Sequence, residues 1–120
     1  MVTISPRVQS WLDAWQGDDP AKVAALYAAT GRHDSARIAA AMPELGLTHL
    51  IGPEELRQYA ARAFARLPWR RFEPTSLTEQ DGYSVLEYLR HSPLDVVPAR
   101  VCEVLQWQGT QLVRSCAYHF

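Results

Sequence analysis

Apolar and polar residues alternate through the last third of the chain, from Tyr83 to Phe120. The alternation is broken at Ser92-Pro93 and at Gly109, which predicts three strands of one antiparallel sheet. Successive side chains of a strand point to opposite faces. In the middle strand, the face predicted to enter the core therefore carries Val97, Ala99, Val101, Leu105 and Trp107.

Glu103 lies on the same face, between Val101 and Leu105. A carboxylate that is removed from water must find a partner, take up a proton or face a cavity. Two interpretations follow. In the first, burial raises the pKa of Glu103 and makes it an acid or a hydrogen-bond donor. In the second, Glu103 forms an ion pair with an arginine such as Arg90 and only organises the core.

Three earlier segments begin with a capping-type residue followed by proline, a signal for the start of a helix: Ser5-Pro6, Asp19-Pro20 and Gly52-Pro53. The first predicted helix ends at Gly17 and carries the apolar stripe Val8, Trp11, Leu12 and Trp15. The second runs from Pro20 to just before Gly31, with one side formed by Val23, Leu26 and Tyr27. The third ends before Pro68 and buries Leu56, Tyr59, Ala60, Ala63, Phe64 and Leu67.

The remaining segments have weaker patterns. Residues 32–35 suit a short strand, residues 36–42 suit a turn or two of helix, and an extended region follows Pro68. Helices followed by a long antiparallel meander predict an α+β fold, with three amphipathic helices on one face of a curved sheet. A length of 120 residues without an internal repeat or linker predicts one domain over residues 1–120.

Charge and composition exclude several classes of function. The net charge is -1 with the two signs interspersed, so we expect neither a nucleic-acid nor a membrane partner. No signal sequence and no apolar run of the ~18 residues that span a bilayer are present, which predicts a cytoplasmic protein. Cys102 and Cys116 lack the spacing of zinc ligands, so no metal site is predicted. No motif indicates a cofactor.

Five local sequences add to the order of the predicted elements. They are Gly17-Asp18 after the first helix, Leu26-Tyr27-Ala28, Gly52, Arg100-Val101-Cys102-Glu103-Val104 and Ala117-Tyr118. Together they resemble the nuclear transport factor 2-like superfamily over nearly the whole chain, above all its SnoaL-like polyketide cyclases and ketosteroid isomerases. The resemblance implies a cone-shaped fold in which helices and a curved sheet enclose a pocket, usually in a homodimer.

The resemblance also implies roles for single residues. In ketosteroid isomerases a protonated aspartate on the middle strand donates a hydrogen bond to a developing enolate, and Glu103 occupies the matching position. The base of those enzymes is an aspartate where this chain has Ser35. His33, on the face of Ser35, and the adjacent Asp34 are therefore the candidate bases. Ser10 replaces the tyrosine of their first helix, which argues against steroid isomerisation itself.

The strand after Gly82 supplies two further candidates. The resemblance places its even positions inward, so that Tyr88 and Arg90 offer a hydroxyl group and a positive charge to an enolate or carboxylate. Alternatively, Arg90 lies at the rim of the pocket with its guanidinium in water.

The register of the last strand decides which side chains share the face of Glu103. A three-residue loop at 108–110 brings Val113, Ser115, Ala117 and His119 to that face. A two-residue turn, Gly109-Thr110, brings Arg114, Cys116 and Tyr118. The similarity at Ala117-Tyr118 favours the first register, which puts His119 in the pocket. The outer face then offers a second subunit the residues Val104, Tyr118 and Phe120.

Two functions remain. The first is a cofactor-independent isomerase, cyclase or hydrolase that moves a proton on an apolar, ring-containing substrate. His33 or Asp34 is its base, and Glu103 with Tyr88 or His119 stabilises the oxyanion. The candidates for lining the ligand site are Trp11, Trp15, Tyr27, Tyr59, Tyr88 and Arg90, although aromatic residues at helical spacing also suit a simple core. The second function is ligand binding or dimeric interaction without catalysis.

Overall fold

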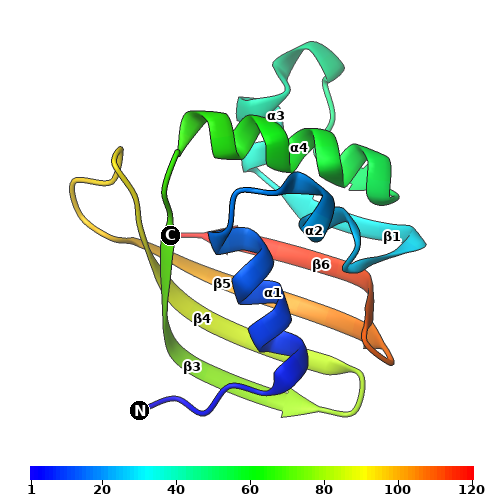
Figure 1. The fold of residues 1–120 in the computed structure, drawn as a ribbon, viewed down its shortest axis with the longest axis vertical. Coiled ribbons are helices and arrows are strands. Elements are labelled where there is room, and N and C mark those ends of the chain that lie inside the picture. Colours follow the sequence, from blue (N-terminus) through cyan, green and yellow to red (C-terminus); the bar gives the residue numbers. More distant parts are fainter.

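A six-stranded sheet with helices on one face makes up the structure, a computed structural model that describes all of residues 1–120 (Figure 1). In chain order the elements are α1 (Pro6–Gln16), α2 (Pro20–Ala24), β1 (Tyr27–Ser35), α3 (Arg37–Ala41), the 3-10 helix η1 (Pro43–Leu45), β2 (His49–Ile51), α4 (Pro53–Arg66), β3 (Arg71–Gln80), β4 (Tyr83–His91), β5 (Ala99–Gln108) and β6 (Gln111–His119). The strand order is β2-β1-β6-β5-β4-β3. All neighbouring strands pair antiparallel except β1 and β6, which are parallel.

The predicted α+β class is confirmed, and the three predicted helices correspond to α1, α2 and α4. Figure 1 shows these helices in front of the strands, with the other face of the sheet uncovered. The apolar stripes of α1 and α4 pack into one cluster with the inner face of the sheet, where Val8, Leu56 and Leu105 are fully buried. No helix combines the length and the apolar character needed to cross a membrane.

The second helix is shorter than predicted. It ends at Ala24, and Tyr27, which the helical pattern places on its apolar side, is the first residue of β1. The Leu26 carbonyl accepts a hydrogen bond from the Leu112 N–H at 2.7 Å, and Tyr27 is the β1 partner of Leu112. Pairing with β6 therefore overrides the local helical pattern. The approach is close, because a Cβ on Gly31 would lie 2.8 Å from the Leu112 carbonyl oxygen.

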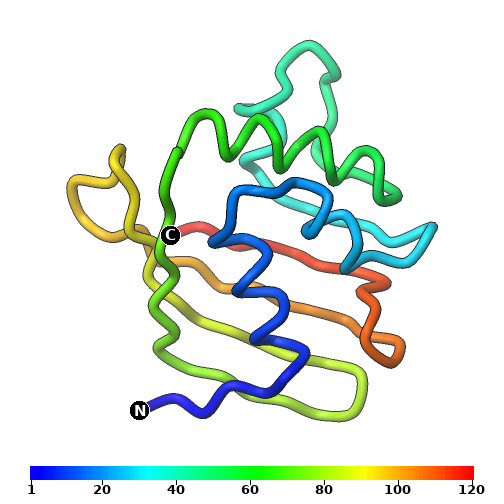
Figure 2. Tube along the Cα trace, in the orientation of Figure 1, coloured from blue at the N-terminus to red at the C-terminus, as the bar shows by residue number.

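The prediction that Val97 enters the core is wrong, since Val97 is 75% exposed. β5 begins only at Ala99, after Pro98, which has no N–H group to donate to the sheet. The preceding segment, residues 92–98, is a loop. Figure 2 shows this loop at the same end of the sheet as the C-terminus.

The turn between β5 and β6 has two residues, Gly109 and Thr110. A β-bulge at Val113 then adds one residue to β6, so that the odd residues from Ser115 onward share the face of Glu103, as expected for the three-residue alternative, although the pairing is shifted by two residues from that alternative. Glu103 consequently pairs with Ala117, and its side of β6 carries Ser115, Ala117 and His119. The sheet therefore directs Glu103 and His119 toward the helices.

Candidate functional site

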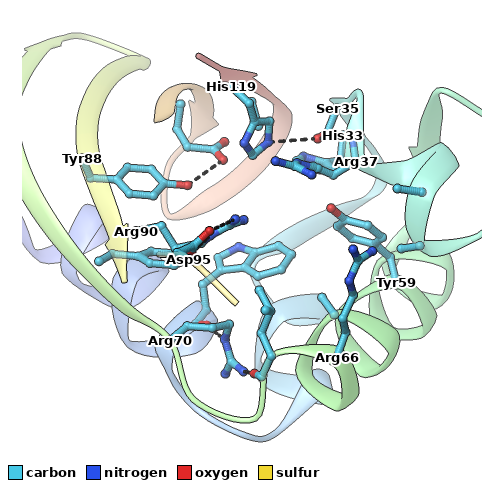
Figure 3. Close-up of a pocket in the computed structure, with 18 of the residues that line it drawn as sticks. His33, Ser35, Arg37, Tyr59, Arg66, Arg70, Tyr88, Arg90, Asp95 and His119 are labelled. Carbon is cyan, nitrogen blue, oxygen red and sulfur yellow. Dashed lines mark hydrogen bonds and ion pairs between the residues drawn. The ribbon is translucent and has the colours of Figure 1, made fainter. Parts of the chain in front are cut away.

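A cavity of about 250 Å³ lies between the helices and the inner face of the sheet. A cavity of ~150 Å³ can hold benzene, so this one has room for a larger ring system. Its walls come from α1, α3, α4, the inner faces of β1, β3, β4, β5 and β6, and the loop after β4. Figure 3 shows polar side chains from several of these elements converging on it.

Aromatic rings form much of the wall. The two tryptophans of α1, Trp11 and Trp15, lie one turn apart on its buried side, with ring centroids 6.4 Å apart. The ring centroid of Trp11 lies 5.7 Å from that of Tyr88, and the Tyr88 ring stacks on Phe72 with a centroid distance of 4.6 Å. The ring centroid of Trp15 lies 6.1 Å from that of Tyr59 in α4. The predicted role of these side chains as a ligand wall is thus compatible with their positions.

Glu103 is only 5% exposed, in the middle of this apolar wall. The Tyr88 hydroxyl donates to its Oε1 at 3.3 Å, and its Oε2 has no hydrogen-bond partner. Burial raises the pKa of Glu103 to about 8, so the carboxyl group is predominantly neutral at pH 7. The alternative ion pair with Arg90 is not formed, because Arg90 Nε donates instead to Asp95 Oδ2 at 3.0 Å.

His33 also faces the cavity, at the end of a buried chain of hydrogen bonds. Its Nδ1 lies 2.7 Å from Ser115 Oγ, which lies 2.6 Å from the Tyr27 hydroxyl. If Tyr27 donates to Ser115 and Ser115 donates to His33, both hydroxyl protons have an acceptor. The reverse direction leaves the Tyr27 proton without one. Burial lowers the pKa of His33 to about 4, so the neutral ring carries its proton on Nε2.

His119 reaches the cavity from the end of β6. Its Nε2 lies 3.5 Å from Ser35 Oγ, and its Nδ1 is buried without a partner. Burial first, and then the positive charges of Arg37 and Arg90, lower the pKa of His119 to about 4. His119 is therefore neutral at pH 7, with one ring nitrogen available to a ligand.

Two predicted site residues do not line the cavity. Asp34 points to the opposite side of β1 from His33, because side chains alternate along a strand. Its carboxylate accepts hydrogen bonds from Arg32 at 2.9 Å and lies 3.7 Å from Arg114, which keep its pKa below the usual range. Tyr27 supports His33 through Ser115 and lies behind the wall. The other predicted site residues all line the cavity: Glu103, His33, His119, Trp11, Trp15, Tyr59, Tyr88 and Arg90.

The sequence reasoning missed three arginines and one carboxylate in the cavity wall: Arg37, Arg66, Arg70 and Asp95. Arg66 carried a usable signal, since it follows Tyr59 by seven residues in a predicted helix and so shares its face. Nothing in the sequence pattern places Asp95 in the wall, because it lies in the loop after β4, where no helical or strand periodicity applies. Arg70 has a structural role, in which it donates to the carbonyl groups of Trp15, Gly17 and Leu67 and covers the Phe64 ring.

Unpartnered buried polar atoms concentrate around the cavity. Of the five in the molecule, four belong to residues of its wall: Trp11 Nε1, Trp15 Nε1, Glu103 Oε2 and His119 Nδ1. Buried polar groups in folded proteins almost always have a partner, so such a cluster needs an explanation. The two tryptophan nitrogens are donors, the neutral Glu103 carboxyl group can donate, and His119 Nδ1 can accept when Nε2 carries the ring proton. The structure holds no group of three or more His, Cys, Asp or Glu side chains suited to a metal ion.

Comparison with known families and structures gives a consistent result. The model of the SnoaL-like domain family matches residues 8–115. A hypothetical protein with a ketosteroid isomerase-like fold from Catenulispora acidiphila, in complex with trimethylamine, superposes with a TM-score of 0.78 at 21% identity, over 97% of this chain and 86% of that chain. A SnoaL-like protein of unknown function from Burkholderia thailandensis superposes with a TM-score of 0.76 at 19% identity, over 93% of this chain and 89% of that chain.

TerC, co-crystallised with polyporic acid, superposes with a TM-score of 0.74 at 12% identity, over 97% of this chain and 92% of that chain. At these identities the superpositions show a shared fold. None of the curated proteins matches the sequence.

Proposed function

The chain belongs to the SnoaL-like domain family, and we propose that it binds an apolar, ring-containing small molecule in the cavity and moves a proton on it without a cofactor. One observation carries the proposal: Glu103 is a neutral carboxyl group in an aromatic wall, with Oε2 free of partners. Such a group donates a hydrogen bond to a ligand carbonyl oxygen, and that bond strengthens as negative charge develops on the oxygen.

His119 is the base of this proposal. When its Nε2 donates to Ser35, the lone pair lies on the unpartnered Nδ1. Glu103 pairs with Ala117, so His119 occupies a diagonal position on the same face, with side chains about 7 Å apart. A carbonyl oxygen at Glu103 and the adjacent C–H group at His119 fit that spacing. His33, with its proton on Nε2, is a second donor to the ligand, and Asp34 takes no part.

A second function, ligand binding without a reaction, is favoured by a different observation. The cavity contains no free carboxylate to act as a base, because Glu103 is neutral and Asp95 is held by Arg90 and Ser92. The support for small-molecule binding is the same for both functions. They differ only in whether a proton leaves the ligand.

Exchange of hydrogen for deuterium on a model ketone separates the two functions. In D2O the methyl group next to the carbonyl of 2-acetonaphthone loses a proton to the base and regains a deuteron, which mass spectrometry detects. Calorimetry measures the binding of the same ketone. We expect binding and accelerated exchange, with a loss of at least about 100-fold in the exchange rate for His119→Gln. His91→Gln, which alters a histidine outside the cavity, should leave the rate unchanged.

Binding without accelerated exchange would support the second function. If the ketone does not bind at millimolar concentration, both functions are wrong.

A further inference from the structure

We propose that the cavity has an anion subsite at its mouth, where Arg37 and Arg66 hold a carboxylate group of the ligand. The inference rests on the proposed function, because it places the ligand in the same cavity and adds the class to which it belongs. The ligand is then a ring compound with an anionic substituent at one end and a carbonyl oxygen near Glu103.

Both arginines occupy cavity-facing positions on their helices. In α4 the residues that line the cavity are Tyr59, Ala63 and Arg66, which form one stripe along the helix, and Leu67 follows directly after its end. In α3 the lining residues are Arg37, Ala40 and Ala41. The small side chains of the lining alanines leave room for a ligand group. Figure 3 shows Arg37 and Arg66 on the same side of the cavity as Tyr59.

Arg37 and Arg66 differ from the other arginines of α4 in that they form no ion pair within the protein. Arg57 bonds Glu54 at 2.6 Å, and Arg62 bonds Glu44, so both arginines of α4 outside the cavity wall have a carboxylate partner. Neither Arg37 nor Arg66 has such a partner. Arg66 lies in the last turn of α4, where the helix dipole stabilises a positive charge. Arg37 is the first residue of α3, where the helix dipole does not stabilise a positive charge.

Positive charge dominates the whole cavity wall, although the chain as a whole has a net charge of -1. The wall carries Arg37, Arg66, Arg70 and Arg90, against Asp95 as the one ionised carboxylate, because burial keeps Glu103 neutral. His33 and His119 are neutral at pH 7 and add no charge. An anionic ligand lowers the electrostatic energy of this arrangement, whereas a cationic ligand raises it.

The geometry of arginine points to a carboxylate. Its planar guanidinium presents paired N–H donors that match the two oxygens of a carboxylate. The aromatic rings of Trp15 and Tyr59, whose centroids lie 6.1 Å apart, line the same cavity and supply the surface for the ligand ring. One end of the ligand is thus recognised by charge and its body by apolar contact.

Two probes of the same shape test the subsite: 2-naphthoate, which carries a carboxylate, and 2-acetonaphthone, in which a methyl group replaces one carboxylate oxygen. Calorimetry at pH 7 should show that the wild type binds 2-naphthoate roughly tenfold more tightly. Added salt should reduce this preference. Arg37→Met and Arg66→Met should each weaken 2-naphthoate binding about threefold to tenfold and leave the ketone within about twofold.

Two controls fix the interpretation. Arg57→Met removes an arginine of α4 outside the cavity wall and should change neither affinity. Arg37→Lys keeps the charge and should retain part of the preference. If 2-naphthoate binds no more tightly than the ketone, or if its preference survives the loss of both arginines, the anion subsite is wrong and the proposed function stands. If neither probe binds, the proposed function fails and the subsite with it.

Discussion

The substitution Glu103→Gln tests whether the buried carboxyl group is neutral. Glutamine is nearly isosteric with glutamate, keeps an N–H donor for a ligand and cannot ionise. In the wild type, burial raises the pKa of Glu103 from 4.5 to about 8. As the pH rises above 4.5 the unfolded chain ionises while the folded protein stays neutral, so the stability that Glu103 contributes at low pH is lost progressively up to about pH 8.

The magnitude follows from the difference between the two pKa values. Each pKa unit corresponds to ~1.36 kcal/mol, so the free energy of unfolding of the wild type falls relative to that of Glu103→Gln by roughly 3 kcal/mol between about pH 5 and 8. At pH 5 the two proteins should differ by no more than about 1 kcal/mol. At pH 8 the glutamine variant should be the more stable protein, with a melting temperature raised by on the order of 10 °C.

Thermal and urea melts of both proteins across this pH range measure the effect. The other titrating groups, including His33 and His119, are present in both proteins and cancel in the comparison. If Glu103 were ionised and paired, glutamine would instead destabilise the protein by about 3 to 5 kcal/mol at every pH of the range. That result would refute the neutral carboxyl group and the role that rests on it.

Three further predictions concern other parts of the molecule. Ser115→Ala should cost roughly 2 to 4 kcal/mol in urea melts, because it leaves the Tyr27 hydroxyl and His33 Nδ1 buried without partners; a cost below about 1 kcal/mol would contradict the hydrogen-bond chain. We propose that the uncovered sheet face, where Tyr118 is 51% exposed, pairs two subunits. Tyr118→Glu should then dissociate the dimer in sedimentation at micromolar concentration, whereas a monomeric wild type would sink this idea. Cys102 and Cys116, both free thiols, should react with a thiol reagent after unfolding without reductant, and a disulfide in the intact mass would count against this.

Period-two geometry accounts for much of what the sequence predicted correctly. The inward position of Glu103 follows from Val101 and Leu105 on either side of it, and the structure confirms it. This inference needs only the local chain, because a strand alternates its faces wherever it lies in the sheet. For Tyr88 alternation alone did not decide between the two faces, and the family resemblance placed it inward; the structure buries Tyr88, and its hydroxyl reaches Glu103.

Long-range pairing explains what the sequence could not predict. Tyr27 fits a helical stripe locally but pairs with β6, which lies more than eighty residues away in the chain. The bulge at Val113 likewise leaves no local mark, although it decides that His119 faces the cavity. Asp34 was predicted as a candidate base, but its neighbours His33 and Ser35 are the residues of β1 that face the cavity. Because side chains alternate along a strand, Asp34 faces the other way. The position of Asp95 in the cavity wall depends on the path of the loop between β4 and β5, which has no pattern in the sequence.

The ionisation of Glu103 can be measured directly by NMR of protein labelled with ¹³C at the glutamate carboxyl groups, with Glu103→Gln to identify the resonance. The account predicts that this resonance titrates with a midpoint near pH 8 and reports a neutral carboxyl group at pH 7. A resonance at the position of an ionised carboxylate from about pH 5 upward would contradict the account, because an ionised Glu103 has no proton to donate to a ligand.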